Sequence, residues 1–438
     1  MRDRSESFRD YIGRICGKQS DKSTCREITF QITNQCNLRC SYCYEHNKTS
    51  GSMSIYTARK CIDTLLKMYK DDNSNFINHK TKGLILDFIG GEPLLEAKLI
   101  EDIIQYYLYE CYNQNIPLYK MTRISFATNG QSWFTPEAQH LIQKYHDMLS
   151  VCISIDGIQE LHDKYRIDQY GNGSFEKAYA AFIDARDKYG WNQSKMTFTP
   201  GSTKYLFESI KMMIESGCND IFCNYAFEPI YTTEDANNIY FQLKKLADYL
   251  ITEQNDIWVS ILSQPVGGMC SNDDNWCGGT GEMLAFDVNG NAYPCIRYMP
   301  ISIGKEKASK MIIGDCYNGL YHTESQITTK NMLSSITRSS QSTKECLECP
   351  VQEGCAWCSG YNYEQTGTPN KRVTHICLAH KARVIAVCYY LNKRNLILND
   401  CNPKKINLPK EEVIDIIGTE NANELYGLEQ DAFNRYRG

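Results

Sequence analysis

The protein has 438 residues, 42% of them hydrophobic and 23% charged, with a formal net charge of -5. This length accommodates a barrel-sized domain and a smaller one, and the composition is that of a soluble globular protein. The acidic balance, without a Lys/Arg run, argues against a nucleic-acid partner. The charged N-terminus lacks the apolar core of a signal peptide, and apolar runs such as 384–391 are too short to span a bilayer. We therefore expect a cytoplasmic protein.

The 21 cysteines are the unusual part of this composition. Disulfides do not persist in a reducing cytosol, so most of these thiols need another explanation. Cys61, Cys111, Cys152 and Cys218 lie in apolar helix or strand patterns, where packing as small buried hydrophobes accounts for them. The clustered cysteines instead indicate that the chain binds a metal or an iron–sulfur cluster.

The first half of the chain alternates strand-like runs with amphipathic helical patterns. One such helix carries apolar residues at Ile55, Ala58, Ile62, Leu65 and Tyr69. Near-continuous apolar strands between helices predict a parallel sheet of βα units. Six units suit an α/β fold, a partial (β/α)6 TIM-like barrel whose functional loops follow the strands. The predicted strands are 27–33, 83–89, 123–129, 149–155, 195–200 and 219–225.

Capping residues indicate where several of these helices begin and end. Thr135-Pro136 opens one helix and Ser174 another, while Gly190 and Gly217 close two. After about residue 256 the periodicity fades, and cysteine, glycine and turn residues take over. Residues 285–295 predict a hairpin with Asn289-Gly290 at its turn. Residues 380–393 predict a helix, and the polar stretch from about 402 predicts two short ones.

Three cysteines follow the first predicted strand in a C-x3-C-x2-C pattern, Cys36, Cys40 and Cys43. Cysteine thiolates normally hold all four irons of a [4Fe-4S] cluster. Three thiolates at this spacing leave the fourth iron open for a ligand that takes part in chemistry. Short cysteine motifs also bind zinc, so the rest of the chain has to decide between the two.

Two further motifs follow later strands. Gly90-Gly91-Glu92-Pro93 allows close backbone approach and offers a carboxylate to a cationic amine. The alternative is a plain strand-to-helix turn. Ser154 ends the fourth strand, and Arg166, downstream of it, can present a fork of donors to a carboxylate. The alternative for Arg166 is a solvated surface position. His162 is expected to be structural.

A second set of eight cysteines lies in the C-terminal half of the chain. Two C-x2-C pairs within it could form a zinc ribbon if they stood alone. Together with the first three cysteines and the GGEP motif, auxiliary iron–sulfur clusters are the better interpretation. The eight are Cys270, Cys277, Cys295, Cys346, Cys349, Cys355, Cys358 and Cys377.

Residues 28–395 resemble the radical S-adenosylmethionine (SAM) enzymes that carry a SPASM extension. The resemblance implies that Cys36, Cys40 and Cys43 hold a cluster whose open iron binds SAM. It implies that Gly90, Gly91 and Glu92 contact the SAM amino group, that Ser154 and Arg166 contact the carboxylate and ribose, and that the backbone at Tyr42 contacts the adenine. It also implies three [4Fe-4S] clusters in all. The first auxiliary cluster would be held by Cys270, Cys277, Cys295 and Cys358, and the second by Cys346, Cys349, Cys355 and Cys377.

Residues 346–393 further resemble maturases of ribosomally made peptides with CXXX repeats. This implies an oxidoreductase that reductively cleaves SAM to a 5′-deoxyadenosyl radical and links peptide cysteines to carbon through thioethers, as in sactipeptides and ranthipeptides. An electron donor such as flavodoxin or ferredoxin is then expected. The expected domains are an N-terminal segment (1–27), the barrel (28–255), the SPASM domain (256–400) and a C-terminal tail (401–438). With so short an N-terminal segment, the barrel, the tail or a separate protein is expected to grip the peptide.

Two departures from the family pattern limit these implications. The Cys355-x2-Cys358 spacing is one residue shorter than the common SPASM pattern. Ile296 follows Cys295 where sulfatase maturases place an aspartate base, which argues against formylglycine formation. Carbon–carbon crosslinking and epimerisation remain rival reactions, and a SAM-independent electron-transfer protein or a peptide-binding adaptor are rivals of another class. Asp156 and Glu228 are candidates for the barrel mouth, but the catalytic base is left unassigned.

Overall fold

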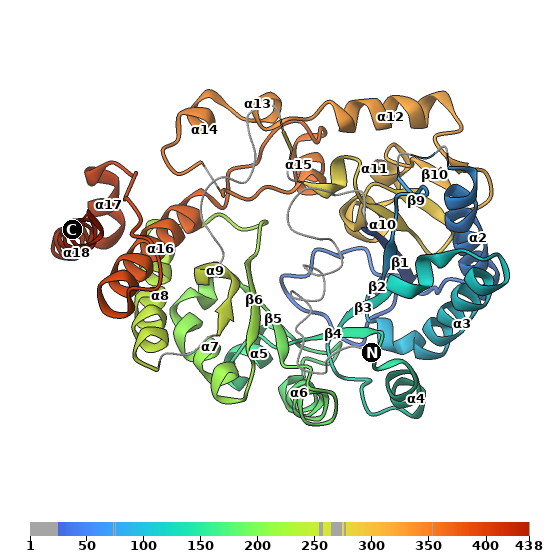
Figure 1. Cartoon of the computed structure of the whole chain (residues 1–438), viewed down its shortest axis with the longest axis horizontal. Helices are drawn as coiled ribbons and strands as arrows, with labels where there is room; N and C mark the ends of the chain where they lie inside the picture. Colours follow the sequence, from blue (N-terminus) through green and yellow to red (C-terminus); the bar gives the residue numbers. More distant parts are fainter. Residues whose placement is uncertain are drawn as a thin grey trace.

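The computed structural model describes residues 25–437 except 73, 75, 254–256, 264–273, 276 and 353. Its central feature is a parallel sheet whose first six strands are hydrogen-bonded in chain order. The sheet does not close, because β1 pairs on its other side with β8 and β6 pairs with β7. This confirms the predicted α/β fold with an open parallel sheet (Figure 1). The six strands are β1 (Cys25–Thr33), β2 (Gly83–Gly90), β3 (Arg123–Thr128), β4 (Leu149–Ser154), β5 (Gln193–Phe198) and β6 (Asp220–Tyr225).

The predicted strands lie within two residues of the observed ones. The largest shift is at β5, which begins at Gln193 rather than 195. The Gln193 side chain donates to the Val151 carbonyl of β4 at 2.7 Å, which anchors this early start. The strand ends before Pro200 because Thr199 and Ser202 cap each other and open a 3-10 helix there.

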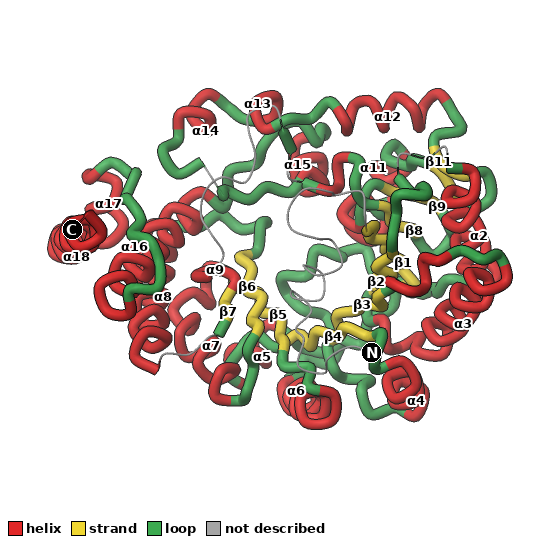
Figure 2. The backbone as a smooth tube through the Cα atoms, in the orientation of Figure 1, coloured by secondary structure: helices red, strands yellow, loops and turns green. Residues whose placement is uncertain are grey.

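Helices cover the outer face of the sheet (Figure 2). Thr135 caps α4 as predicted, since its side chain accepts from the Ala138 N–H, and Gly190 closes α6 with φ 67°. Ser174 is the N-cap residue of α6, as predicted, but its side chain makes no capping hydrogen bond. Asp163 accepts from the Ser174 and Phe175 N–H groups instead, which leaves the Ser174 hydroxyl for other partners. The helices are α2 (Ile55–Asp71), η1 (Pro93–Glu96), α3 (Ala97–Asn113), η2 (Pro117–Met121), α4 (Pro136–Tyr145), α5 (Gln159–Tyr165), α6 (Phe175–Tyr189), η3 (Pro200–Tyr205), α7 (Leu206–Glu215) and α8 (Thr233–Glu253).

The C-terminal half continues the same sheet. The predicted hairpin is present, with Gly290 at φ 82° in the turn between β8 (Leu284–Phe286) and β9 (Asn291–Tyr293). β8 lies parallel to β1, and Phe30 contacts both Phe88 and Phe286 at ring-centroid distances of 5.6 and 5.8 Å. Each fully buried phenylalanine stabilises the fold by about 1.5–3 kcal/mol. The core of the parallel sheet therefore extends into the cysteine-rich half of the chain.

Among the remaining elements, α12, α13 and α14 lie along the top of the view in Figure 1. The long helix α16 packs along α8, where the Tyr389 hydroxyl donates to Asp248 at 2.7 Å. No helix in the described ranges is long and apolar enough to cross a membrane. The elements are β7 (Trp258–Val259), α9 (Ser260–Ser263), η4 (Gly278–Thr280), η5 (Ile296–Tyr298), α10 (Pro300–Ile303), α11 (Lys305–Ser309), β10 (Gly314–Asp315), β11 (Gly319–Leu320), α12 (Glu324–Ser334), α13 (Arg338–Gln341), α14 (Lys344–Glu348), α15 (Ser359–Thr366), α16 (Cys377–Leu398), α17 (Lys410–Ile417) and α18 (Thr419–Arg437).

Candidate active site

A cavity of about 410 Å³ lies where the parallel strands end, and we call it the central cavity. Loops at the C-terminal ends of parallel strands are the usual place for an active site in such folds. The cavity gathers the first cysteine triad, residues that follow β2, β3, β4 and β6, and one cysteine of the second set. Its predicted site residues are Cys36, Cys40, Cys43, Tyr42, Gly91, Glu92, Ser154, Arg166 and Cys358.

The loop that carries the triad is held against the segment that carries Arg166. The Arg39 N–H donates to the Ile167 carbonyl at 2.6 Å, and the Ser41 N–H donates to the Tyr165 carbonyl at 3.0 Å. A further antiparallel bridge joins Leu38 to Asp168. These backbone contacts fix the three thiols relative to Arg166.

The two glycines of the GGEP motif are required by the backbone that passes over them. A Cβ at Gly91 would lie 2.2 Å from the Gln35 carbonyl oxygen and 2.7 Å from the Cys36 Cβ. A Cβ at Gly90 would lie 2.5 Å from the Thr33 carbonyl oxygen. Because no side chain fits there, the strand end can brace the first residues of the cysteine loop.

Glu92 holds neighbouring strand ends together. Its carboxylate, 1% exposed, accepts from the Thr128 hydroxyl at 2.6 Å and from the Asn129 and Leu94 N–H groups at 2.8 and 3.1 Å. Burial raises the pKa of Glu92, while these hydrogen bonds lower it. The carboxylate is thus fixed at the cavity wall, and its contact with a SAM amino group stays a prediction.

Arg166 forms a buried polar network with two partners. Its Nη1 donates to the Tyr42 hydroxyl at 2.9 Å, and that hydroxyl donates to Asp156. Burial raises the pKa of Asp156, and the Arg166 charge opposes that shift. The Arg166 Nε has no hydrogen-bond partner among the described residues. A buried donor at the cavity wall fits an incoming carboxylate, as the SAM prediction requires.

His162 is structural, as the sequence predicts. It is fully buried, and burial lowers its pKa to about 3, so the ring is neutral at physiological pH. Its Nε2 contacts the Ser174 hydroxyl at 3.0 Å, and that hydroxyl donates to the Arg166 carbonyl at 2.7 Å. The ring therefore supports the backbone that presents Arg166.

The triad thiols are half-buried and lie beside cations. Burial raises the pKa of Cys36 to about 12 and raises that of Cys40, where the Arg166 charge opposes the shift. Lys48 donates to the Cys43 sulfur at 2.9 Å and to the Glu45 carbonyl at 2.7 Å. Cations next to thiols favour the thiolate form that metal binding requires. These surroundings suit a cluster held by three thiolates.

The second set of cysteines falls into two groups. Burial raises the pKa of Cys295, and the neighbouring Cys358 and Cys277 raise it further. The fourth thiol implied for this group, Cys270, lies outside the described residues. Burial also raises the pKa of Cys377 to about 11, with added contributions from the second group, Cys346, Cys349 and Cys355.

This grouping is the division that the family resemblance implies, although ligation itself stays a prediction. Within the described ranges, no group of three or more His, Cys, Asp or Glu side chains is arranged to hold a single metal ion. Cluster thiolates bind separate irons and need not converge on one point.

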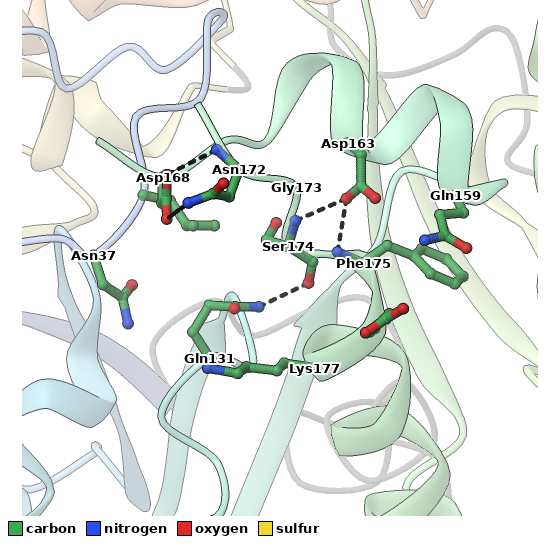
Figure 3. Close-up of a pocket in the computed structure, with 12 residues that line it drawn as sticks. Asn37, Gln131, Gln159, Asp163, Asp168, Asn172, Gly173, Ser174, Phe175 and Lys177 are labelled. Atoms are coloured by element: carbon green, nitrogen blue, oxygen red, sulfur yellow. Dashed lines mark hydrogen bonds between the residues drawn. The ribbon is translucent and has the colours of Figure 1, made fainter. Parts of the chain in front are cut away.

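A second pocket of about 510 Å³ lies beside the triad loop (Figure 3). Leu38 lines both this pocket and the central cavity. Several polar groups of this pocket are paired with one another: Asp168 accepts from Asn172, and Gln131 donates to the Ser174 carbonyl at 2.8 Å. We interpret these contacts as the framework that positions the Arg166 segment.

Several residues of the site carry no sequence motif. Thr128 ends β3 and Asn129 comes directly after it, Lys48 follows the triad, and Arg297 lies two residues after Cys295. Arg297 bridges Glu228 at 2.9 Å and Glu364 at 3.3 Å. In the sequence, only their positions after strands or cysteines could have marked these residues as part of the site. Their contacts could not be predicted, because the residues that they contact are distant in sequence.

Comparison with known proteins identifies a sequence family within the first half of the chain. Residues 30–216 match the sequence family described as the Radical SAM superfamily. The chain contains a radical SAM domain. Such a domain implies a [4Fe-4S] cluster and SAM. The triad, the GGEP motif and Arg166 all lie within the matched range.

The curated relatives match about a third of this chain. An uncharacterized protein MJ0907 of Methanocaldococcus jannaschii is 35% identical over 34% of this chain and 43% of its own. A cysteine-type anaerobic sulfatase-maturating enzyme of Clostridium novyi is 28% identical over 33% of this chain and 36% of its own. The subtilosin biosynthesis protein AlbA of Bacillus subtilis is 28% identical over 32% of this chain and 26% of its own. The chain thus spans less than half the length of each of these three relatives.

Two solved structures share the fold over most of the chain. Native anSMEcpe with bound AdoMet and Cp18Cys peptide has a TM-score of 0.62 and 17% identity, covering 86% of this chain and 99% of its own. Streptococcus suis SuiB bound to precursor peptide SuiA has a TM-score of 0.54 and 15% identity, covering 81% of this chain and 76% of its own. At these identities the likeness concerns the fold.

Proposed function

We propose that this radical SAM protein modifies a ribosomally made, cysteine-rich peptide and joins its cysteine sulfurs to carbon through thioethers. The observation that carries the proposal is the central cavity, which brings the triad, Arg166 and Cys358 of the second cysteine set to one space. The fold likeness to anSMEcpe and SuiB, both solved with peptides, supports a peptide substrate. The match to AlbA supports it from sequence.

Different residues of the central cavity would bind the cluster and SAM. Cys36, Cys40 and Cys43 would hold the cluster, and Arg166, with its unpartnered Nε, would bind the SAM carboxylate. When bound, the cluster and SAM supply a carbon-centred radical that abstracts hydrogen. The protein's own part is orientation: Tyr42 and Asp156 hold the Arg166 guanidinium, and Gly91 braces the cysteine loop.

The second cysteine set would hold the auxiliary clusters. Cys358 lines the central cavity beside Arg297, which places one group of these thiols next to the substrate space. Forming one thioether from a C–H and an S–H removes two hydrogens from the peptide. One hydrogen atom leaves with the deoxyadenosyl radical, and the other is lost as a proton to solvent and an electron. That electron needs an acceptor, a role that suits the auxiliary clusters.

Another peptide modification on the same scaffold is the alternative. Formylglycine formation is favoured by the match to the sulfatase-maturating enzyme. It is disfavoured by Ile296, because an aliphatic side chain cannot act as a base there. Epimerisation and carbon–carbon crosslinking leave the peptide thiols free, which separates them from thioether formation.

The test is anaerobic co-expression with a cysteine-rich peptide encoded beside the gene, followed by mass spectrometry. We expect a loss of two hydrogens per link, together with loss of alkylation at the linked cysteines. A matched variant with Cys36, Cys40 and Cys43 all changed to Ala should return the peptide unchanged. A Cys61→Ala variant controls for general loss of thiols, because Cys61 is a buried helix residue away from the cavity. A modified peptide whose thiols all remain alkylatable would overturn the thioether assignment.

A further inference from the structure

The central cavity contains few groups that could accept a proton. Joining a peptide sulfur to carbon requires the thiol to lose its proton, so a proton acceptor is needed beside the substrate. Among the described residues that line this cavity, only Glu92 and Glu228 carry a carboxylate, and none is a histidine. The ammonium and guanidinium groups there have no lone pair to offer. Burial raises the pKa of the lining tyrosines Tyr42, Tyr44 and Tyr225, so they keep their protons.

Glu92 is already engaged by the protein. It is 1% exposed, and its carboxylate accepts three hydrogen bonds from residues around it. Asp156, the other carboxylate that the sequence places near the barrel mouth, is 2% exposed and does not line the central cavity. Its two oxygens accept from the Tyr42 hydroxyl and from the Thr197 N–H. Neither carboxylate is open to a substrate.

Glu228 is the carboxylate that remains available. Its side chain is 31% exposed, and its Oε1 accepts from the Arg297 Nη1 at 2.9 Å. No hydrogen bond from a described residue reaches its other oxygen. The backbone at this position is fixed, because the Tyr361 hydroxyl and the His375 Nδ1 contact the Glu228 carbonyl at 3.1 and 2.9 Å. Glu228 therefore offers one free carboxylate oxygen from a fixed position in the cavity wall.

Arg297 holds Glu228 where the two sets of cysteines approach each other. Its guanidinium lies over the ring of Tyr44, on the triad loop, at 4.8 Å. It also lies over the ring of Tyr361 at 5.5 Å, and Tyr361 belongs to α15, which begins directly after Cys358. The same guanidinium contacts Glu364 of α15 at 3.3 Å. Glu228 is thus held beside the space that the triad and Cys358 share.

We infer that Glu228 is the catalytic base that accepts the proton of the substrate cysteine when the thioether forms. The inference rests on the proposed function. The S–H bond breaks, the proton passes to the free Glu228 oxygen, and the sulfur forms its bond to the carbon from which hydrogen was removed. The proton then leaves Glu228 for solvent, to which its side chain is partly exposed. The electron released as the C–S bond forms goes to the auxiliary clusters, as in the proposed function.

The test is Glu228→Gln in the reconstituted full chain, with SAM, a reductant and the cysteine-rich peptide encoded beside the gene. Glutamine keeps the shape of the side chain and an acceptor for Arg297 but cannot take up the proton. A cysteine thiol with a pKa of about 8.5 is only about 3% ionised at pH 7, so we expect about 30-fold less thioether per deoxyadenosine at pH 7. At pH 8.5, where half of the thiol is ionised, the deficit should shrink to about twofold.

The narrowing of this deficit with pH reports on the substrate thiol, since the groups around Glu228 are the same in both proteins. The charged and titratable side chains that face it are Arg297, Tyr231, Tyr361, Glu364 and His375. A peptide with selenocysteine at the target position gives an independent check. A selenol is already ionised at neutral pH, so this peptide should restore product formation by Glu228→Gln.

Glu364→Gln is the matched control. It alters the other carboxylate partner of Arg297, but Glu364 does not line the central cavity. We expect this variant to keep the wild-type ratio of thioether to deoxyadenosine. The same loss in both variants would show that Glu228 acts only by orienting Arg297, and would overturn the inference. An unchanged ratio in Glu228→Gln, or a parallel fall of thioether and deoxyadenosine, would overturn it as well.

The wild-type reaction separates this inference from the proposed function. A wild-type chain that forms no thioether in any peptide refutes the proposed function, and the assignment of Glu228 with it. A wild-type chain that forms thioethers, with the same yield per deoxyadenosine in Glu228→Gln, keeps the proposed function and loses only the base.

Discussion

Gly91→Ala should disrupt the cysteine loop without removing any cysteine. The added Cβ would lie 2.2 Å from the Gln35 carbonyl oxygen and 2.5 Å from the carbonyl carbon. Favourable nonbonded contacts begin at about 3.5 Å, so the backbone must move by about 1 Å. Overpacking of this kind costs about 1–3 kcal/mol. The Glu92 N–H bond to the Gln35 carbonyl, 2.9 Å long, would also be lost at about 1 kcal/mol.

Two measurements check this prediction. Urea unfolding of the apo protein should show a loss of about 2–4 kcal/mol in the free energy of unfolding. Iron and sulfide content after reconstitution should fall, because the Cys36 Cβ would lie 2.7 Å from the new methyl group. Gly427→Ala is the control: Gly427 lies in α18, where nothing meets an added Cβ, and a helical Ala stabilises by about 1 kcal/mol. Full iron content and unchanged stability in Gly91→Ala would refute the bracing role.

Three further predictions concern charged side chains. Arg166→Lys keeps the charge but loses the donor fork, so SAM affinity by calorimetry should fall about tenfold. Lys48→Met removes the hydrogen bond to the Cys43 sulfur, so an EPR-monitored titration should give a more negative reduction potential for the triad cluster. Burial, with the neighbouring Glu27, raises the pKa of Asp87 to about 7. The stability that the neutral Asp87 carboxyl gives the folded protein is therefore lost as the pH rises through 7. Asp87→Asn should then stabilise the apo protein by about 1–2 kcal/mol at pH 8 and have little effect near pH 4.

Each of these predictions can fail on its own. Unchanged SAM affinity in Arg166→Lys would show that the guanidinium fork does not hold the carboxylate. An unchanged potential in Lys48→Met, with Lys48→Arg as the charge-preserving comparison, would place the lysine outside the influence of the cluster. An Asp87→Asn effect that does not vary with pH would mean that the Asp87 carboxyl does not titrate as its burial implies.

The parallel strands could be predicted because buried strands appear in the sequence as continuous apolar runs. The hairpin of β8 and β9 could be predicted from its Asn289-Gly290 turn, but the pairing of β8 with β1, which joins the hairpin to the parallel sheet, could not. Helix caps could likewise be predicted only where the capping residue is next to the helix in sequence. Thr135 caps the helix that follows it, a local relation, whereas Asp163 caps α6 from eleven positions before Ser174.

The candidate site was predictable where family motifs mark it and not where partners are distant. The triad, Gly91, Glu92, Ser154 and Arg166 all line the central cavity. Tyr42 also lines it, but its hydroxyl pairs with Asp156 and Arg166, a contact that the spacing of the residues does not reveal. The roles of Lys48 and Arg297 depend on which thiols the fold places beside them. The domain boundaries and the cluster ligands remain predictions.

The most direct test of the central claim is an anaerobic reaction of the reconstituted protein with SAM, a reductant and the cysteine-rich peptide encoded beside the gene. Deoxyadenosine and the peptide mass are followed together. We predict one deoxyadenosine for each loss of two hydrogens, with the linked thiols no longer open to alkylation. Deoxyadenosine release with an unchanged peptide mass, in a reaction where the peptide is bound, would contradict the claim that this chain forms thioethers.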